Sequence, residues 1–277
     1  MSTKVGSFDA RVPRQYPELR VSELPWYIPG LSYPVVVRRL TMVRRPWNES
    51  DEAKSSYVKE LFSALAKRYN VMTDVWTLGL HRLWKRQAME LCALRPGERV
   101  LDVATGTGDL AFLEEAAVGP EGQVVGVDSC APMLEVARGR QRGAVDFQEG
   151  DAMDLRFPDA SFDVVTISFG LRNVADRDQA LREFRRVLRP GGRLMVLDFS
   201  TPTSKMLKAV HDLFYFGVMP KVGWAVAWHR DAHHYTSDSI RTWLSRDELS
   251  KAMLEAGFVD ARYISLSTGF ATVHFGL

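Results

Sequence analysis

From residue 100 onward, short apolar runs alternate with segments of helical periodicity. Runs such as VLDVA (100–104), QVVGVD (123–128) and FDVVTISF (162–169) are followed by segments such as DLAFLEEAA (109–117) and DQALREFRRVL (178–188). Continuous apolar strands joined through helices are typical of a parallel sheet that is covered on both faces. The pattern therefore predicts an α/β fold with a doubly wound, mostly parallel sheet.

Two helices are predicted before the first strand. In ESDEAKSSYVKELFSALAKRY (49–69), Ser50 is a candidate N-cap, acidic residues fill the first turn, and an apolar stripe recurs at helical spacing. A second helix is predicted from about Asp74 to Cys92, before the turn RPGER. Together they predict a helical N-terminal part beside the sheet.

The first 48 residues differ from the rest of the chain. Residues 1–46 carry eight Lys or Arg, three Asp or Glu and six of the 13 prolines, without helical or strand periodicity. We predict a disordered basic extension over residues 1–48, without a catalytic role, and one domain over residues 49–277. Two alternatives are an arm that contacts anionic lipid and an upstream stretch preceding a functional start at Met42.

Composition narrows the class of protein. The 277 residues are 46% hydrophobic and 25% charged, which is ordinary for a globular chain. The net charge of +2 becomes −3 when residues 1–46 are set aside, which argues against a nucleic-acid enzyme. The longest apolar stretch, Leu213 to Trp228, is interrupted by Pro220 and Lys221, and no signal-peptide pattern is present, so we predict a cytoplasmic protein.

No metal site is predicted. The two cysteines, Cys92 and Cys130, are too few for a disulfide framework or a zinc site, and we expect both to be packing residues. His229 and His233 stand four residues apart, but no third ligand follows them.

The stretch VLDVATGTGDLA (100–111) has the form of a nucleotide-binding loop. Gly106, Gly108 and Ala111 fit the pattern G-x-G-x-x-G/A, and Asp128 follows Gly108 by 20 residues, as an acidic ribose ligand does. This pattern alone is compatible with a nicotinamide cofactor and with other cofactors that contain adenosine.

Three further features favour S-adenosylmethionine. Asp102 lies at the exit of the first strand, where a carboxylate is suited to holding a cation or ordering the loop. Asp151 and Ala152 follow the third strand and offer a place for an adenine edge. The helix, Pro-Gly-Gly turn and strand in RVLRPGGRLMVLDF (186–199) are not required by a nicotinamide enzyme. We therefore predict a methyltransferase and keep a nicotinamide-dependent dehydrogenase as the alternative.

From about Asp51 to its end, the chain resembles the ubiquinone/menaquinone C-methyltransferase family of class I S-adenosylmethionine-dependent enzymes. The matching motifs are LFSALAKRYNVM, HRLWK, LDVATGTGDLA, ISFGLRNV and RVLRPGGRLMVLDFS. The resemblance implies a seven-stranded sheet whose last strand is antiparallel. It also implies methyl transfer to a ring carbon of a demethylated, prenylated benzoquinol or naphthoquinol. A methyltransferase of another small aromatic or specialised metabolite is the alternative.

The resemblance also assigns cofactor residues. It places Thr107 at the loop threonine, and Gly106 and Gly108 allow the backbone to approach the ligand closely. Alternatives exist for three of the assigned side chains: a helix cap for Asp128, a turn hydroxyl for Thr107 and a satisfied strand-end hydroxyl for Ser168. The predicted cofactor set is Asp102, Gly106, Thr107, Gly108, Asp128, Asp151, Ala152 and Ser168.

The predicted catalytic set is Arg172, Asn173 and Tyr69. Arg172, in FGLRNV, is placed to stabilise an oxyanion of the quinol, although a guanidinium does not act as a base. Its alternative role is a salt bridge to Asp176 or Asp178. Asn173 can orient a quinol oxygen, and Tyr69 is the tyrosine of the family's YDxMN signature.

The base that takes the quinol proton is not singled out. Four histidines, His81, His211, His233 and His234, fall in segments expected to cover the substrate, and imidazole has a suitable pKa. Their spacing does not distinguish between them.

Three departures from the family pattern fall where substrate is expected. Asn70 replaces the aspartate of YDxMN, Asp198 replaces a glutamate, and His233 replaces an aromatic residue. A substrate lid is predicted around residues 203–245, because its apolar residues suit a ring and tail. A lipophilic quinol also predicts peripheral contact with the inner face of the membrane, and we expect a homodimer.

Overall fold

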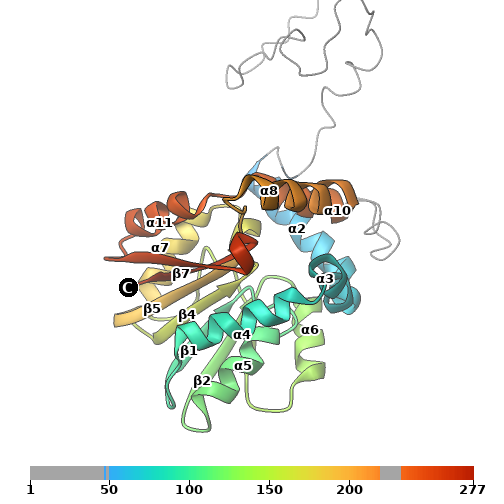
Figure 1. Cartoon of the computed structure of the whole chain (residues 1–277). Helices are drawn as coiled ribbons and strands as arrows, with labels where there is room; N and C mark the ends of the chain where they lie inside the picture. The colour runs from blue at the N-terminus through green and yellow to red at the C-terminus, as the bar shows by residue number, and fades with distance from the viewer. Residues whose placement is uncertain (1–46, 48–49, 219–231) are drawn as a thin grey trace, which may run out of the picture. The chain divides into compact units, whose positions relative to one another are not determined.

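The structure, a computed structural model, describes residues 47, 50–218 and 232–277 (Figure 1). The predictions made for the first 46 residues and for Pro220, Lys221 and His229 lie outside the described residues. No helix within these described ranges is long and apolar enough to cross a membrane.

Seven strands form one sheet in the order β3-β2-β1-β4-β5-β7-β6. All neighbouring pairs are parallel except those of β7, which runs antiparallel to both β5 and β6. The predicted doubly wound, mostly parallel α/β sheet is therefore confirmed. The strands are β1 (Arg99–Val103), β2 (Gln123–Asp128), β3 (Asp146–Glu149), β4 (Phe162–Ser168), β5 (Leu188–Phe199), β6 (Ala261–Leu266) and β7 (Ala271–Gly276).

Helices cover both faces of the sheet and group at one end of it (Figure 1). Two apolar clusters separate the layers: α4, α5 and α6 contribute to one, α7 and α11 to the other. The helices are α2 (Asp51–Leu65), η3 (Ala66–Arg68), α3 (Tyr69–Thr77), α4 (Leu80–Cys92), α5 (Asp109–Val118), α6 (Ala131–Arg140), η4 (Leu171–Asn173), α7 (Arg177–Val187), α8 (Lys205–Asp212), η5 (Leu213–Val218), α10 (Ala232–Arg241), α11 (Arg246–Glu255) and η6 (Ser267–Gly269).

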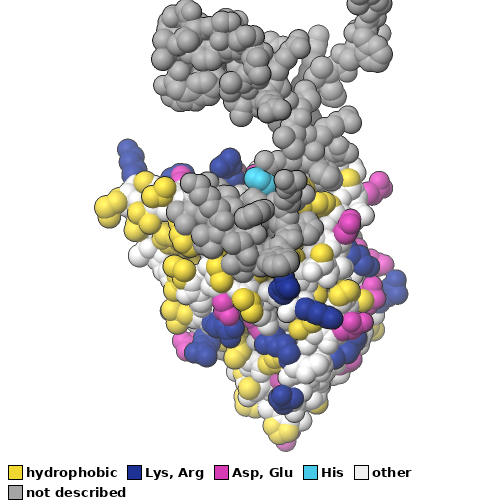
Figure 2. Space-filling view, turned by 90° about the vertical axis from the view of Figure 1, so that its right-hand side faces the viewer, with side chains coloured by type: hydrophobic (Ala, Val, Ile, Leu, Met, Phe, Trp, Pro, Cys, Tyr) yellow, Lys and Arg dark blue, Asp and Glu magenta, His cyan; other side chains and the backbone are white. Residues whose placement is uncertain are grey.

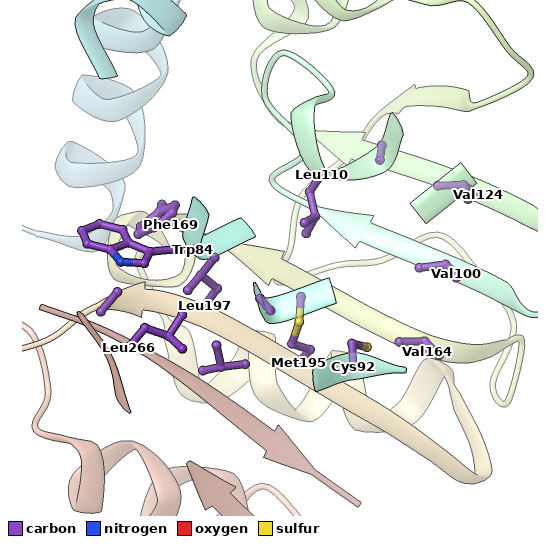
Figure 3. Close-up of a cluster of buried hydrophobic side chains, with 14 of the residues drawn as sticks. Trp84, Cys92, Val100, Leu110, Val124, Val164, Phe169, Met195, Leu197 and Leu266 are labelled. Carbon is purple, nitrogen blue, oxygen red and sulfur yellow. The ribbon is translucent and has the colours of Figure 1, made fainter. Parts of the chain in front are cut away.

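The centre of the first cluster is fully buried. Trp84 on α4 is completely buried, and its ring lies beside Phe169 (Figure 3), with a centroid distance of 6.2 Å. The centroid of the Phe199 ring is also 6.2 Å away. Cys92 is buried in the same cluster, which confirms that it is a packing residue. Cys130 is buried in a smaller cluster, but it also lines a cavity at the ends of the strands. This packing fixes α4 against the strands that carry the site.

The predicted helix boundaries before β1 need a correction. Ser50 is the N-cap as predicted, and its side chain accepts a hydrogen bond from Ala53 N at 3.1 Å. The start of the second helix near Asp74 is wrong, because α3 continues to Thr77 and α4 begins only at Leu80. The break falls where Leu78 and Gly79 adopt left-handed backbone, φ +51° and +74°. A corner therefore separates α3 from α4.

The strand order reverses between β1 and β4. β1 pairs with β2 on one side and with β4 on the other. In an open parallel sheet, such a reversal leaves a crevice at the carboxyl ends of the two strands. The site predicted from the sequence lies at this edge.

Candidate active site

The loop after β1 turns through left-handed backbone. Gly106 has φ +58° and Gly108 has φ +82°, and α5 begins at the residue after Gly108. A Cβ at Gly108 would lie 2.9 Å from the rings of Phe112 and Phe147. This position therefore needs glycine for its conformation and for its space.

Two buried carboxyl groups lie beneath this loop. Asp102 accepts a hydrogen bond from Thr105 Oγ1 at 2.7 Å, and Thr166 Oγ1 lies 2.6 Å from Glu114 Oε1 and 3.3 Å from Asp102. Burial raises the pKa of Asp102 to about 7. Burial, and then the charge of Asp102, raise the pKa of Glu114 well above its ordinary value. Asp102 thus orders the loop from below rather than lining a cavity.

Asp128, at the end of β2, joins two loops. Its Oδ2 accepts a hydrogen bond from Gly106 N at 2.8 Å, and its Oδ1 accepts one from Cys130 N at 2.9 Å. Cys130 is the N-cap of α6 and makes no capping bond with its own side chain. Burial raises the pKa of Asp128, and these two backbone donors oppose the rise. Asp128 therefore caps the start of α6 and also lies at the crevice.

A first cavity opens at the carboxyl ends of the strands. Its walls come from the ends of β1, β2 and β4, from the segment after β3, and from one face of α2. Ser168 Oγ is buried there and has no hydrogen-bond partner within residues 50–218 and 232–277. Seven predicted residues line this cavity: Tyr69, Gly106, Asp128, Asp151, Ala152, Ser168 and Asn173.

Thr107 belongs to the glycine loop, but its side chain contacts α3 and does not line the first cavity. Its hydroxyl donates to Asn70 Oδ1 at 2.7 Å, and Arg140 Nη1 donates to its carbonyl at 2.7 Å. Like Asp102 and Gly108, it is absent from the lining of the first cavity. The hydroxyl ties the loop to α3, and Asn70 supplies the acceptor at the position where the family has aspartate.

A second cavity adjoins the first and shares Phe62, Tyr69 and Phe169 with it. Its lining is mostly aromatic and aliphatic, and it comes from α2, α3, the start of α4, the ends of β4 and β5, η5 and α10. The remaining lining residues are Leu61, Leu65, Met72, Thr73, Trp76, Thr77, His81, Arg172, Phe199, Tyr215, Thr236 and Ser237.

Arg172 is the buried cation of the second cavity. Its Nη1 donates to Asp198 Oδ1 at 2.8 Å and to Phe169 O at 2.6 Å, and the side chain is 7% exposed. Its guanidinium carbon lies 5.0 Å from the centroid of the Phe199 ring. The ion-pair partner is thus Asp198, not Asp176 or Asp178. Burial raises the pKa of Asp198, and Arg172 opposes the rise.

Tyr69 lines both cavities, whereas Asn173 lines the first. Asn173 accepts a hydrogen bond from Tyr235 OH at 3.0 Å, so α10 is tied to η4. Burial raises the pKa of Tyr69, which keeps its hydroxyl protonated.

Sequence reasoning missed the part of α2 that lines the first cavity. Val58 and Phe62 were assigned only to an apolar helical stripe, and Lys59 was not considered. The stripe was a usable signal, because a helix that buries one face beside a loop of this kind can contribute to a ligand site.

Comparison with known proteins places the chain in a family. The ubiE/COQ5 methyltransferase family profile matches residues 50–277. The chain belongs to this family. It is therefore an S-adenosylmethionine-dependent methyltransferase, as predicted from Asp102, from Asp151 with Ala152, and from the segment 186–199.

Curated relatives agree over most of the chain. It is 44% identical over 234 residues to a protein of Pseudomonas entomophila (strain L48), covering 83% of this chain and 91% of the relative. It is 45% identical over 230 residues to a protein of Hydrogenovibrio crunogenus, covering 81% and 91%. Both relatives are named ubiquinone/menaquinone biosynthesis C-methyltransferase UbiE.

Solved structures show the same fold. A Thermotoga maritima methyltransferase described as a possible histamine N-methyltransferase matches with a TM-score of 0.56 and 23% identity, covering 78% of this chain and 98% of its own. A methyltransferase from Aquifex aeolicus matches with a TM-score of 0.53 and 17% identity, covering 69% and 88%. At these identities the likeness supports the fold alone.

The first cavity fits the cofactor of this family. The unpartnered Ser168 hydroxyl, the Asp128 carboxylate and the Gly106 backbone meet in one crevice, where a nucleoside needs polar partners. A carboxylate at a strand end suits a ribose diol because it accepts hydrogen bonds only.

Proposed function

We propose that this enzyme methylates a ring carbon of a demethylated, prenylated benzoquinol or naphthoquinol in respiratory quinone biosynthesis. The observation that carries the proposal is the aromatic second cavity, which adjoins the first and holds the buried cation Arg172. Two relatives of more than 40% identity bear names from that pathway. An apolar ring and tail suit this lining.

The first cavity would hold the cofactor through the residues predicted from the sequence. Asp128 would accept hydrogen bonds from the ribose hydroxyls, Asp151 and Ala152 would lie beside the adenine, and Ser168 would face the remaining polar atoms. Gly106 would let the backbone approach. When bound, S-adenosylmethionine supplies an activated methyl group on a sulfonium. The remaining residues of the predicted set, Asp102, Thr107 and Gly108, would hold the loop in shape.

The second cavity would hold the quinol. Arg172 would stabilise negative charge on a ring oxygen, an effect that grows in a site with little water. Asn173 would orient that oxygen. Tyr69 stands at the junction of the cavities, where it would place the ring against the methyl group.

Methyl transfer to quinols of both ring types tests the proposal. Purified enzyme is incubated with S-adenosylmethionine and either a demethylated naphthoquinol or a ubiquinone-precursor benzoquinol, and products are analysed by mass spectrometry. We expect one added methyl on at least one ring type. A strain from which the gene is deleted should accumulate a quinone precursor that lacks one methyl group.

A second candidate is methylation of another small aromatic ring. Two departures from the family pattern favour it: Asn70 contacts the glycine loop through Thr107, and Asp198 contacts Arg172. Activity on soluble phenols but not on prenylated quinols would support this candidate.

A prenylated quinol substrate lies in the membrane, so the enzyme needs a surface that can bind to lipid. Met206, Val210 and Leu213 are exposed at helical spacing on α8 and the turn that follows, beside the exposed Lys205. Figure 2 shows one face of the molecule, on which hydrophobic side chains gather beside basic ones and acidic side chains also occur. Such a surface suits anionic lipid. We propose peripheral binding at the cytoplasmic face of the membrane; flotation with phosphatidylglycerol vesicles, compared between wild type and Leu213→Asp, tests it.

Two further proposals concern the whole chain. The enzyme forms a homodimer, which light scattering of the purified protein tests. Residues 1–48 take no part in catalysis, and a chain that begins at Met42 keeps its activity.

A further inference from the structure

His81 is a buried titratable residue to which the proposed function assigns no role. It lies in the first turn of α4, is 1% exposed, and lines the second cavity together with Arg172 and Tyr215. The corner at Leu78 and Gly79 turns α4 back on α3, so that His81 meets Asp74, seven residues earlier.

The hydrogen bonds of Asp74 fix which ring nitrogen of His81 carries the proton. Asp74 accepts from Arg82 Nε at 2.7 Å and Arg82 Nη2 at 2.8 Å, and its Oδ1 lies 2.8 Å from His81 Nε2. The Arg82 hydrogen bonds lower the pKa of Asp74 to about 2. An ionised carboxylate only accepts hydrogen bonds, so Nε2 carries the proton and donates it.

The other ring nitrogen is left with a lone pair and no partner. His81 Nδ1 is buried, and no hydrogen bond to it exists within residues 50–218 and 232–277. A buried polar atom without a hydrogen-bond partner is unfavourable, and this nitrogen can accept a hydrogen bond from a hydroxyl group. Burial lowers the pKa of His81 despite the opposing bond to Asp74, so the ring is neutral at pH 7.

We propose that His81 is the catalytic base, with its Nδ1 accepting the proton of a quinol hydroxyl, and that Asp74 is the positioning residue that holds its tautomer. This inference rests on the proposed function, since it requires a hydroxylated ring in the second cavity. It completes a division of work in that cavity: His81 takes the proton and Arg172 stabilises the oxyanion.

In the proposed step, a proton moves from the quinol to His81 and a methyl group moves from sulfur to a ring carbon. The O–H bond of the quinol breaks, its electron pair stays on oxygen, and the proton bonds to Nδ1. Charge spreads from oxygen to the adjacent ring carbon, whose electron pair bonds the methyl carbon, while the sulfonium sulfur keeps the pair of the bond that breaks. The ring carbon then releases its proton to water, and the imidazolium returns its own to the ring oxygen.

Replacement of His81 is the first test. The probe is a demethylated naphthoquinol with one prenyl unit, kept reduced under argon. In His81→Ala and His81→Gln we expect kcat to fall at least about 100-fold, the low end of the range for loss of a general base. KM and the affinity for S-adenosylhomocysteine, measured by calorimetry, should change less than about threefold. The matched control is His274→Gln, a buried histidine that lines neither cavity and should keep its kcat.

The pH profile supplies a readout that a structural role would not change. Wild-type kcat should rise with deprotonation of His81 and level off near neutral pH, whereas His81→Ala should rise continuously into alkaline solution, as the free quinol ionises. Added imidazole should restore part of the rate of His81→Ala. The charged groups that act on this titration, or share the cavity with it, are Asp74, Lys85, Asp109 and Arg172.

The positioning role has its own pair of variants. Asp74→Asn should lower kcat about tenfold or more, because the amide can impose the wrong tautomer on His81. Glu90→Gln, the same change of carboxylate to amide at an exposed position of α4 that lines neither cavity, should change kcat little. Equal losses in the two variants would mean that the carboxylate acts only through the fold.

The outcomes separate this inference from the proposed function. If wild-type enzyme does not methylate any quinol, the proposed function fails. If wild type is active and His81→Ala keeps its kcat, or loses activity while its pH profile is unchanged, His81 is not the base. A matching loss of cofactor affinity and melting temperature in the His81 variants would likewise overturn the assignment and make His81 structural.

Discussion

The two cavities differ in what builds them. Much of the first is supplied by one edge of the sheet: strand ends, the glycine loop and one carboxylate that accepts from two backbone amides. The second is lined by residues from helices and strand ends that are far apart in the sequence, from Leu61 on α2 to Ser237 on α10. Strand ends are positioned by the fold itself, whereas the residues that helices contribute can change acceptor while the fold is kept.

The comparison assigns a separate task to each cavity. Variants in the first should reduce cofactor binding, and variants in the second should reduce turnover while cofactor binding is kept.

Asp128→Ala should abolish cofactor binding. Two ribose hydroxyls bound to a charged acceptor are worth roughly 3 kcal/mol or more, a factor of at least about 100 in Kd. Calorimetric titration with S-adenosylhomocysteine measures the loss, and Asp128→Asn, whose single amide oxygen can keep only one of the two backbone bonds, should also bind more weakly. Asp146→Ala, an exposed acid at the start of the neighbouring strand β3, is the control. Unchanged affinity in Asp128→Ala would refute the role of the first cavity.

Arg172→Gln should lower kcat by about 100-fold, as loss of an oxyanion partner does, and leave the affinity for S-adenosylhomocysteine within about threefold. The variant leaves Asp198 buried without its partner, so its melting temperature is measured in parallel. Arg177→Ala, a more exposed arginine five residues later, is the control. Loss of cofactor affinity equal to the loss of kcat would erase the distinction between the cavities.

The sequence predicted the first cavity well because its parts are local. The strand, the glycine loop and the acid at the end of the next strand follow one another in the sequence. In a doubly wound sheet, the topology alone brings these parts together at one edge. Ser168 and Asp151 could therefore be named before the structure, as could the doubly wound sheet. Sequence spacing does not show whether the side chain of a loop residue points into the cavity or away from it. The contact of Thr107 with Asn70 was therefore not predicted.

The second cavity was mostly hidden from the sequence. A continuous helix from Asp74 to Cys92 would place Asp74 and His81 about 10 Å apart along its axis. The sequence therefore did not predict a hydrogen bond between these two side chains. The left-handed corner at Leu78 and Gly79 brings the two side chains into contact. In the sequence, only the glycine at position 79 indicates such a corner. The Arg172 partner was missed for a related reason: Asp198 lies on a neighbouring strand, 26 residues away.

Gly108→Ala should have an intermediate effect on the first cavity. The substitution requires a left-handed φ and meets the Phe112 and Phe147 rings at 2.9 Å, so it should cost about 1–3 kcal/mol of stability. We expect a lower melting temperature and weaker cofactor binding, with KM for the quinol unchanged. Gly139→Ala, a glycine in α6 with no atom within 4 Å of the added carbon, should be neutral or stabilising. A fully stable Gly108→Ala protein would show that the loop relaxes freely.

Glu114→Gln should affect stability alone, and in a pH-dependent way. The folded state keeps Glu114 protonated because burial and then Asp102 raise its pKa, whereas in the unfolded chain it ionises near pH 4.5. Unfolding therefore releases a proton, and this group lowers stability as pH rises above that value, by about 1.4 kcal/mol for each unit of pKa difference. Glutamine cannot ionise, so the variant should gain melting temperature relative to wild type between pH 5 and pH 8, with kcat kept. An equal difference at both pH values would mean that the carboxyl is ionised in the fold, and that the loop of the first cavity rests on a buried charge.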